Sequence, residues 1–167
     1  PTRRVFETFA DGTTNPWGVD FDDFGQCFVS NCVNPHLFHM IPGGHYEPWR
    51  NRVSSLYAYE RIPTVADHLH YPGGDIRATL GKADTLALGG GHSHCGTLIY
   101  LGDLFPAGYR NTAFMCNVHG RRINNDVLKA KGSGYTASHG KDFMISADPW
   151  FMGVTLRTGP DGSVFVS

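Results

Sequence analysis

The chain has 167 residues, of which 14 are lysine or arginine and 15 are aspartate or glutamate, so its formal net charge is −1 with histidine neutral. That balance argues against a nucleic-acid-binding domain, which usually carries a basic excess. No stretch approaches the roughly 18 consecutive apolar residues of a membrane span, so no transmembrane segment is expected in this chain. Glycine is enriched, at 21 residues, and 41% of the residues are hydrophobic, which indicates a turn-rich chain with a core.

Short runs of β-forming residues recur along the sequence, separated by glycine, proline, asparagine and aspartate. The predicted strands lie at 17–22, 27–30, 37–41, 97–101, 113–118, 143–146, 154–157 and 163–166. Helical periodicity is weak, and many short strands with regular turn signals predict an all-β fold. At most a short helix is expected, around residues 64–68.

The strand pair near the N-terminus is repeated near the C-terminus. The N-terminal copy contains Pro16-Trp17-Gly18-Val19 and Gly25-Gln26-Cys27-Phe28-Val29-Ser30, and the C-terminal copy contains Pro149-Trp150 and Gly162-Ser163-Val164-Phe165-Val166-Ser167. A weaker third copy puts Phe114 86 residues after Phe28 and 51 before Phe165, so the period is about 43 to 51 residues if one copy has diverged. Periods in the forties are typical of propeller blades, which are four-stranded sheets around a central axis.

We therefore predict an all-β, β-propeller fold of four-stranded blades, with residues 1–167 forming one partial propeller domain. Blade-like repeats are expected near 15–50, 91–130 and 142–167, with a long loop or an elaborated blade at 50–90. The chain has room for about three to four blades, whereas closed propellers use roughly four to eight. The remainder of the propeller, or another copy of the chain, would cover the exposed blade faces. An ordinary β-sandwich is the alternative fold.

Nine histidines are an unusual number for this length, and most lie in glycine-rich turns beside predicted strands. His92 and His94 precede the strand at 97–101, where a propeller would direct their imidazoles towards the mouth of the axial channel. Neutral imidazole near pH 7 can act as a general base or a metal ligand, so these two residues are the candidate catalytic bases. A turn held by hydrogen bonds between imidazole and backbone explains them equally well.

Two further groups offer ligand-binding chemistry. His119, Arg121 and Arg122 follow the strand at 113–118, and a guanidinium fork there could bind an anionic cofactor or substrate. Asp67, His68 and His70 have residue types that could bind a metal ion, although a salt bridge in a loop would use the same residues.

The other histidines and the cysteines are less informative. His36 and His39 lie three residues apart beside a predicted strand and are expected to be structural or interfacial. Cys27 and Cys32 could form a disulfide in an exported protein, or could be two free thiols. None of the four cysteines has CxxC or CxxCH spacing, so no zinc ribbon or haem attachment site is predicted within these residues.

Several segments taken together resemble a known family. The most informative are Asn15-Pro16-Trp17-Gly18-Val19-Asp20-Phe21-Asp22, Asp67-His68-Leu69-His70-Tyr71, His92-Ser93-His94-Cys95-Gly96 and His119-Gly120-Arg121-Arg122-Ile123-Asn124. They resemble the propeller domain of the planctomycete-type membrane-bound dehydrogenases, a family related to the sorbosone and soluble glucose dehydrogenases. The resemblance covers essentially the whole chain.

The resemblance implies a piece of an exported six-bladed propeller, periplasmic or associated with a membrane through other domains. It also implies oxidation of a sugar or alcohol substrate, with pyrroloquinoline quinone and Ca²⁺ over the axial channel and haem c in a separate downstream domain. His92 or His94 is similar to the base of those enzymes, and His119, Arg121 and Arg122 would bind the cofactor. Two other classes stay open: a non-catalytic propeller that binds glycans or a partner protein, and a metal-dependent lactonase or hydrolase.

Overall fold

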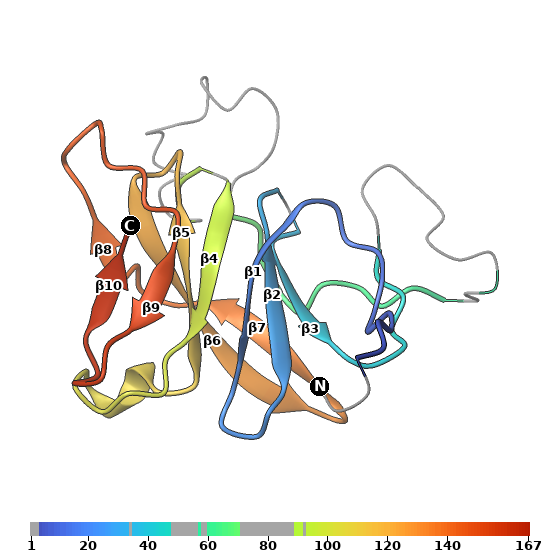
Figure 1. The fold of residues 1–167 in the computed structure, drawn as a ribbon. Coiled ribbons are helices and arrows are strands. Elements are labelled where there is room, and N and C mark those ends of the chain that lie inside the picture. Colours follow the sequence, from blue (N-terminus) through green and yellow to red (C-terminus); the bar gives the residue numbers. More distant parts are fainter. Residues whose placement is uncertain (1–3, 34, 48–56, 58–59, 71–88, 92) are drawn as a thin grey trace.

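Three antiparallel β-sheets form the described part of the chain, and hairpins follow one another along the sequence (Figure 1). The computed structural model describes residues 4–33, 35–47, 57, 60–70, 89–91 and 93–167. The first sheet has the order β1-β2-β3, with bounds Pro16–Phe21, Cys27–Asn31 and Leu37–Met40. Gly25 turns the chain between β1 and β2 with a φ of +75°, a conformation that favours glycine.

The second sheet is the largest, with the order β4-β5-β6-β7 and with β8 also paired to β6. Its strands are β4 (His94–Ile99), β5 (Thr112–Asn117), β6 (Arg122–Lys131), β7 (Gly134–His139) and β8 (Met144–Ile145). The first two residues of β6 pair with β8 and its second half pairs with β7, so one edge of β6 is covered by two strands in succession. The third sheet pairs β9 (Leu156–Thr158) with β10 (Val164–Val166).

The first strands of the three sheets, β1, β4 and β9, lie next to one another, as the inner strands of a propeller do (Figure 1). Thr97 joins β4 to β1, because its hydroxyl donates a hydrogen bond to the Gly18 carbonyl at 3.0 Å. Gly18 has a φ of +111°, and a Cβ there would lie 2.4 Å from the backbone nitrogen of Thr97. The close approach of β1 and β4 therefore requires glycine at this position.

Two groups of buried side chains fill the spaces between the sheets. The group between the first and second sheets consists of Phe28, Leu37, Ile99, Ala113, Met115 and Ala137. The group between the second and third sheets consists of Cys95, Leu98, Tyr100, Phe114, Cys116, Ile123 and Leu156. Burying a large apolar side chain contributes about 1.5–3 kcal/mol, so these two groups hold the sheets face to face.

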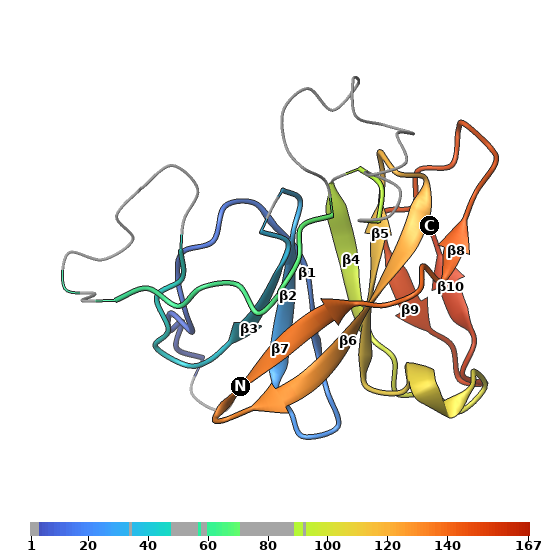
Figure 2. The ribbon, with the colours of Figure 1, turned by 180° about the vertical axis from the view of Figure 1, so that it is seen from behind.

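Residues 60–70 connect the first sheet to the second. The Val65 amide donates to the Leu37 carbonyl at 3.1 Å, and the Ala137 amide donates to the Val65 carbonyl at 2.7 Å, so this segment lies between β3 and β7 (Figure 2). It does not form the short helix expected at 64–68, since Ala66 makes a parallel bridge with Ala137. The segment stays extended because β3 and β7 form hydrogen bonds with its backbone N–H and C=O groups.

The all-β prediction is confirmed, because the described residues contain strands and a 3-10 turn at Ala107–Tyr109 but no α-helix. The sequence did not predict β6 or β7. The first half of β6 is rich in asparagine and aspartate, which have low strand propensity, yet it pairs with neighbouring strands on both edges. Nowhere in the described part of the chain is there a helix with the length and hydrophobicity of a membrane span.

Candidate functional site

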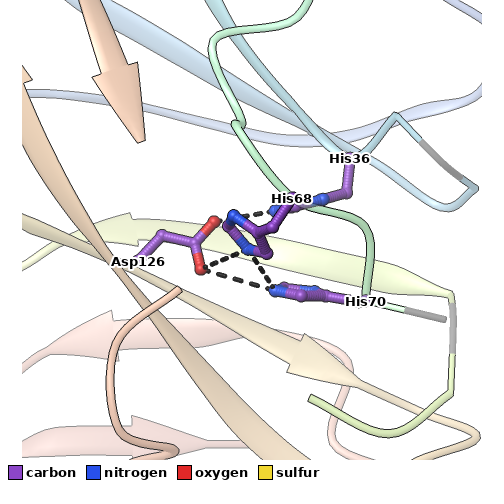
Figure 3. A group of neighbouring side chains, drawn as sticks. All are labelled: His36, His68, His70 and Asp126. Carbon is purple, nitrogen blue, oxygen red and sulfur yellow. Dashed lines mark hydrogen bonds and ion pairs between the residues drawn. The ribbon is translucent and has the colours of Figure 1, made fainter. Parts of the chain in front are cut away.

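Four side chains of metal-ligand type meet in the interior between the first and second sheets (Figure 3). His36 immediately precedes β3, His68 and His70 belong to the 60–70 segment, and Asp126 lies in the middle of β6. One ligand atom from each residue lies within 4.8 Å of the others. The side chains of His36, His70 and Asp126 are fully buried, and that of His68 is 12% exposed. We call these four residues the histidine–aspartate cluster.

Local backbone contacts explain how the cluster is assembled. The Asn31 amide donates to the His36 carbonyl at 2.8 Å, which closes the turn between β2 and β3. The Asp67 amide donates to the Ala137 carbonyl at 2.9 Å, which fixes the 60–70 segment just before its two histidines. Asp126 is paired within the sheet on both sides, since β6 lies between β5 and β7. Three separately anchored parts of the chain therefore bring their side chains to one place.

The contacts inside the cluster are short. The Nε2 atom of His36 lies 2.7 Å from Oδ2 of Asp126. The Nε2 atoms of His68 and His70 lie 3.3 and 3.4 Å from Oδ1 of the same carboxylate, and 3.1 Å from each other. The rings of His36 and His70 are stacked, with their centroids 3.9 Å apart. Three imidazoles of the cluster thus converge on one carboxylate, and Nδ1 of His139, on β7, lies 3.9 Å from Oδ1 of the same carboxylate.

Further residues hold two of these imidazoles from the outside. The Nδ1 atom of His70 lies 2.5 Å from Nε2 of His94, at the start of β4. The Nδ1 atom of His68 lies 3.0 Å from Oδ1 of Asp67. Asp67 is held in turn by Ser138 on β7, whose hydroxyl donates to Oδ2 at 2.6 Å. The ring orientations of His68 and His70 are therefore fixed by their second nitrogen atoms.

The cluster contains an ionised carboxylate and at least one neutral imidazole. Burial acts to raise the pKa of Asp126, but His36 and hydrogen bonds from neighbouring histidines outweigh burial and hold that pKa well below its usual range. Burial, helped by His36, lowers the pKa of His70 to about 3, so its ring is neutral at pH 7. For His68 burial acts in the same direction, yet the carboxylates of Asp126 and Asp67 raise the pKa above its ordinary value.

Two buried polar atoms of the cluster have no hydrogen-bond partner among the described residues. They are Oδ1 of Asp126 and Nδ1 of His36. Buried polar atoms are normally paired, because leaving one unsatisfied costs about 1–3 kcal/mol. Oδ1 of Asp126 faces the Nε2 atoms of His68 and His70. The described residues therefore meet the acceptor capacity of this atom only through ion-pair contacts of 3.3 Å or longer.

A separate pocket of about 320 Å³ lies where the inner strands begin, and we call it the axial pocket. Its lining residues come from the starts of β1 and β4, the chain before β9 and nearby turns. They are Asn15, Trp17, Cys32, Ser93, Cys95, Val118, His119 and Val154. His94 and Cys95 are neighbours on β4 and point to opposite sides, so the cluster and the axial pocket lie on opposite faces of this strand.

A second hollow, of about 440 Å³, lies at the other end of β4 beside β9 and contains the charged residues Asp20, Asp103 and Arg157. Asp20 has a structural task there, because its carboxylate accepts a hydrogen bond from the Ile99 amide at 2.8 Å. No histidine or cysteine belongs to the described lining of this hollow. We therefore place the candidate chemistry in the axial pocket and the cluster.

His119 is the imidazole of the axial pocket. It lies in the turn between β5 and β6, and its Nδ1 atom is 3.3 Å from the hydroxyl oxygen of Ser93. Partial burial lowers the pKa of His119, so the ring is neutral at pH 7 and can accept a proton. Of the two predicted bases, His94 is buried against His70, and His92 lies outside the described residues.

The two predicted arginines are placed differently from each other. Arg121 is exposed in the turn beside His119, with a φ of +51°. Arg122 is buried and forms a 2.6 Å ion pair with Asp142, and it does not belong to the described lining of the axial pocket. This buried ion pair instead links β6 to the segment between β7 and β8, the two strands that pair with one edge of β6.

The metal-binding group predicted from the sequence, Asp67, His68 and His70, differs from the group that the structure brings together. His68 and His70 are in the cluster, whereas Asp67 contacts the outer nitrogen of His68. His36 is expected from the sequence to be structural or interfacial, and Asp126 is not singled out there. The local signal for Asp126 as a site residue is that it ends a polar run in the middle of a strand. Its partner His36 lies 90 residues away in the sequence, so the pairing itself has no local signal.

Neither the cluster nor the described lining of the axial pocket offers a suitable set of ligands for Ca²⁺ or for pyrroloquinoline quinone, which is an anion. Ca²⁺ takes roughly six to eight oxygen ligands, whereas the cluster offers three imidazoles and the described lining of the axial pocket includes no carboxylate. An anionic quinone is held by cationic side chains, and that lining includes no lysine or arginine. The cluster and the described lining of the axial pocket therefore do not fit Ca²⁺ or pyrroloquinoline quinone.

Three antiparallel sheets with adjacent inner strands, and a pocket where those strands begin, define a propeller-like all-β domain. The chain belongs to the family described as a domain of unknown function, DUF7133, whose family model matches residues 1–167. No curated protein matches the chain in sequence.

Solved structures with a similar fold are glucose dehydrogenase-type proteins. One such structure, from Thermus thermophilus, has a TM-score of 0.63 and 16% identity, with 98% of this chain and 42% of that chain covered. Two glucose dehydrogenases have TM-scores of 0.59 and 0.53 and identities of 17% and 18%, and in both 96% of this chain is covered, against 43% and 39% of theirs. The chain therefore spans about two fifths of the length of these structures, and the likeness establishes the fold alone.

Proposed function

We propose that the chain is part of a dehydrogenase-type propeller that oxidises a hydroxyl group of a sugar or alcohol in the axial pocket. The observation that carries this proposal is the presence of a neutral, proton-accepting imidazole, His119, in a pocket where the inner strands begin. The fold shared with glucose dehydrogenase-type proteins supports the same reaction class. The rest of a six-bladed ring would come from further parts of the protein or from another copy of the chain.

The axial pocket suits a small neutral ring. Its volume of about 320 Å³ lies at the lower end of the roughly 300–1,000 Å³ of typical ligand sites. Trp17 is 51% exposed and offers an apolar ring face, while Ser93 and His119 offer polar groups. No charged side chain belongs to the described lining, so a neutral sugar or alcohol is favoured over an anionic substrate.

The residues of the pocket supply a proton acceptor. Oxidation of an alcohol removes a hydride from carbon and a proton from the hydroxyl group. When Nδ1–H of His119 donates to the Ser93 hydroxyl, Nε2 carries the lone pair that takes this proton. Both electrons leave with the hydride, and an electron acceptor of the quinone or dye class has to come from outside the described residues.

The test is dye-linked oxidation of a panel of aldoses and alcohols by the whole protein, with and without added quinone. The His119→Gln variant should lower kcat/KM at least about 100-fold, the smaller end of the usual contribution of a general base. His45→Gln is the matched control, because it makes the same exchange in a partly exposed pair, 2.8 Å from Asp11, and should leave the rate unchanged.

Two outcomes would overturn the proposal. Wild-type rates in the His119→Gln variant would remove His119 as the base. Failure to oxidise any aldose or alcohol, together with hydrolysis of lactones when divalent metal ions are added, would favour the lactonase class. Native mass spectrometry of the whole protein would separately test whether the ring is completed within one chain or by copies of it. An exported location and a downstream haem c domain belong to the same proposal and are tested by fractionation and by haem absorbance.

A further inference from the structure

We propose that the histidine–aspartate cluster binds one divalent first-row transition metal ion, and that Zn²⁺ is the ion it fits best. This site goes beyond the proposed oxidation chemistry and does not depend on it. The cluster lies between the first and second sheets, on the face of β4 opposite the axial pocket. Its donor set is also different in kind from the calcium site that the family resemblance implies.

Three of the four donor atoms are separated as they are around a tetrahedral ion. Metal–ligand bonds of about 2.0–2.1 Å place the ligand atoms of a tetrahedral zinc site about 3.3–3.4 Å apart. The Nε2 atoms of His68 and His70 are 3.1 Å apart, and they lie 3.3 and 3.4 Å from Oδ1 of Asp126. The fourth ligand atom, on His36, has to move away from the carboxylate, because it lies only 2.7 Å from Oδ2.

The donor atoms select the class of ion. Imidazole nitrogens suit zinc, copper, iron and nickel, whereas calcium and magnesium take oxygen ligands almost exclusively. Three imidazoles and one carboxylate, with three of the four donor atoms at tetrahedral separations, match Zn²⁺, which is almost always tetrahedral in structural sites and accepts nitrogen and oxygen ligands together. Cysteine takes no part in the cluster.

The outer contacts of His68 and His70 have the form expected around ligating histidines. A metal-bound histidine usually donates its second ring N–H to a carboxylate or another acceptor, which fixes the tautomer and aims the ligating nitrogen. The second nitrogen of His68 faces Asp67, and that of His70 faces His94. Both Nε2 atoms are therefore directed inwards, towards Oδ1 of Asp126, from which they lie 3.3 and 3.4 Å.

The site joins parts of the fold that are far apart in the sequence. His36 belongs to the first sheet, His68 and His70 to the segment between the sheets, and Asp126 to the second sheet. Structural zinc sites have four protein ligands, whereas catalytic sites keep one position for water or substrate. Four protein ligands in a buried position thus point to a stabilising role at the junction of the two sheets.

The first experiment measures the metal content of the whole protein, purified without a histidine tag and dialysed, by inductively coupled plasma mass spectrometry. We expect about one zinc or other first-row transition ion per chain. After removal of the metal with a chelator, Co²⁺ should produce the intense visible absorption of a tetrahedral cobalt site, and excess Ca²⁺ should not compete. A wild-type protein that retains no transition ion and gives no cobalt spectrum overturns the proposal, with no variant needed.

Variants then assign the ligands. His70→Gln and Asp126→Asn should each lower the retained metal at least about tenfold, whereas His45→Gln, the same exchange in a surface pair, should retain it. Asp67→Asn should weaken Zn²⁺ binding about 10–100-fold while the tetrahedral cobalt spectrum persists, because Asp67 positions His68 without ligating. Retention of metal at the wild-type level in a folded His70→Gln variant would overturn the assignment. Loss of metal with unchanged sugar oxidation would leave the proposed function intact, so the two proposals can fail separately.

Discussion

Replacing Gly18 with alanine tests the packing of the inner strands β1 and β4. Gly18 has a φ of +111°, and an added Cβ would lie 2.4 Å from the backbone nitrogen of Thr97 and 2.9 Å from its hydroxyl oxygen. The nearest atom belongs to the backbone, so rotation of a side chain cannot relieve the clash. The two strands would have to move apart.

The expected loss of stability has three parts. A residue with a Cβ in a left-handed conformation costs about 1–2 kcal/mol, and overpacking a close contact costs about 1–3 kcal/mol. Displacing Thr97 also weakens its 3.0 Å hydrogen bond to the Gly18 carbonyl, which contributes about 0.5–1.5 kcal/mol. We therefore expect Gly18→Ala to lower the free energy of unfolding by about 3–6 kcal/mol, a large part of the 5–15 kcal/mol typical of a domain.

Gly25→Ala is the matched control, because Gly25 also has a positive φ, of +75°, but a Cβ there would meet nothing within 4 Å. This variant should lose only the conformational part, about 1–2 kcal/mol. The assay is urea unfolding of the whole protein, followed by circular dichroism and tryptophan fluorescence. Equal destabilisation by the two substitutions would refute the close contact between β1 and β4.

Three further predictions concern pH and metal. Because burial lowers the pKa of His119, kcat/KM for sugar oxidation should rise with pH through that lowered pKa and level off by about pH 6.5, the ordinary value for histidine; a rise centred above that pH in a pH–rate profile would contradict the role of His119 as base. Burial also lowers the pKa of His39, despite the nearby Asp22 carboxylate, and the ring is bonded to Gln26 at 2.9 Å. As the pH falls, the unfolded chain protonates His39 before the folded chain does, so the stability from His39 is present above about pH 6.5 and is lost at lower pH. Urea titrations at several pH values should show that the free energy of unfolding falls less steeply with decreasing pH in His39→Gln than in the wild type. The same dependence on pH in both proteins would disprove the effect. Removing the metal with a chelator should lower the melting temperature, since an ion at 100 times its Kd contributes about 2.7 kcal/mol; an unchanged melting temperature in differential scanning calorimetry would argue against the stabilising role.

The hairpins of the first and third sheets could be predicted because their signals are local. Gly25 and Gly162 both have positive φ and lie two residues before short apolar strands, so turn chemistry and strand pattern agree within a few residues. The repeat of this arrangement was also visible in the sequence, and it led to the all-β, propeller-like fold. The long strand β6 was not predicted, because Asn124, Asn125 and Asp126 carry no local preference for a strand.

The candidate site was only half visible in the sequence. The alternation of His68 and His70 marked a possible ligand pair, and the enrichment in histidine suggested chemistry near the inner strands. The sequence could not show that His94 faces the cluster while its neighbour Cys95 faces the axial pocket, because that depends on which side of β4 each residue occupies.

Short-range patterns in the sequence thus determined the strands of the first and third sheets, the glycine turns and the repeated strand pair, since each of these features depends on residues a few positions apart. The tertiary structure alone decided the cluster. His36 and Asp126 are 90 residues apart in the chain and meet only because β3, the 60–70 segment and β7 hydrogen-bond to one another in succession. Contacts of this kind depend on the packing of whole sheets, and no short-range pattern of residues encodes them.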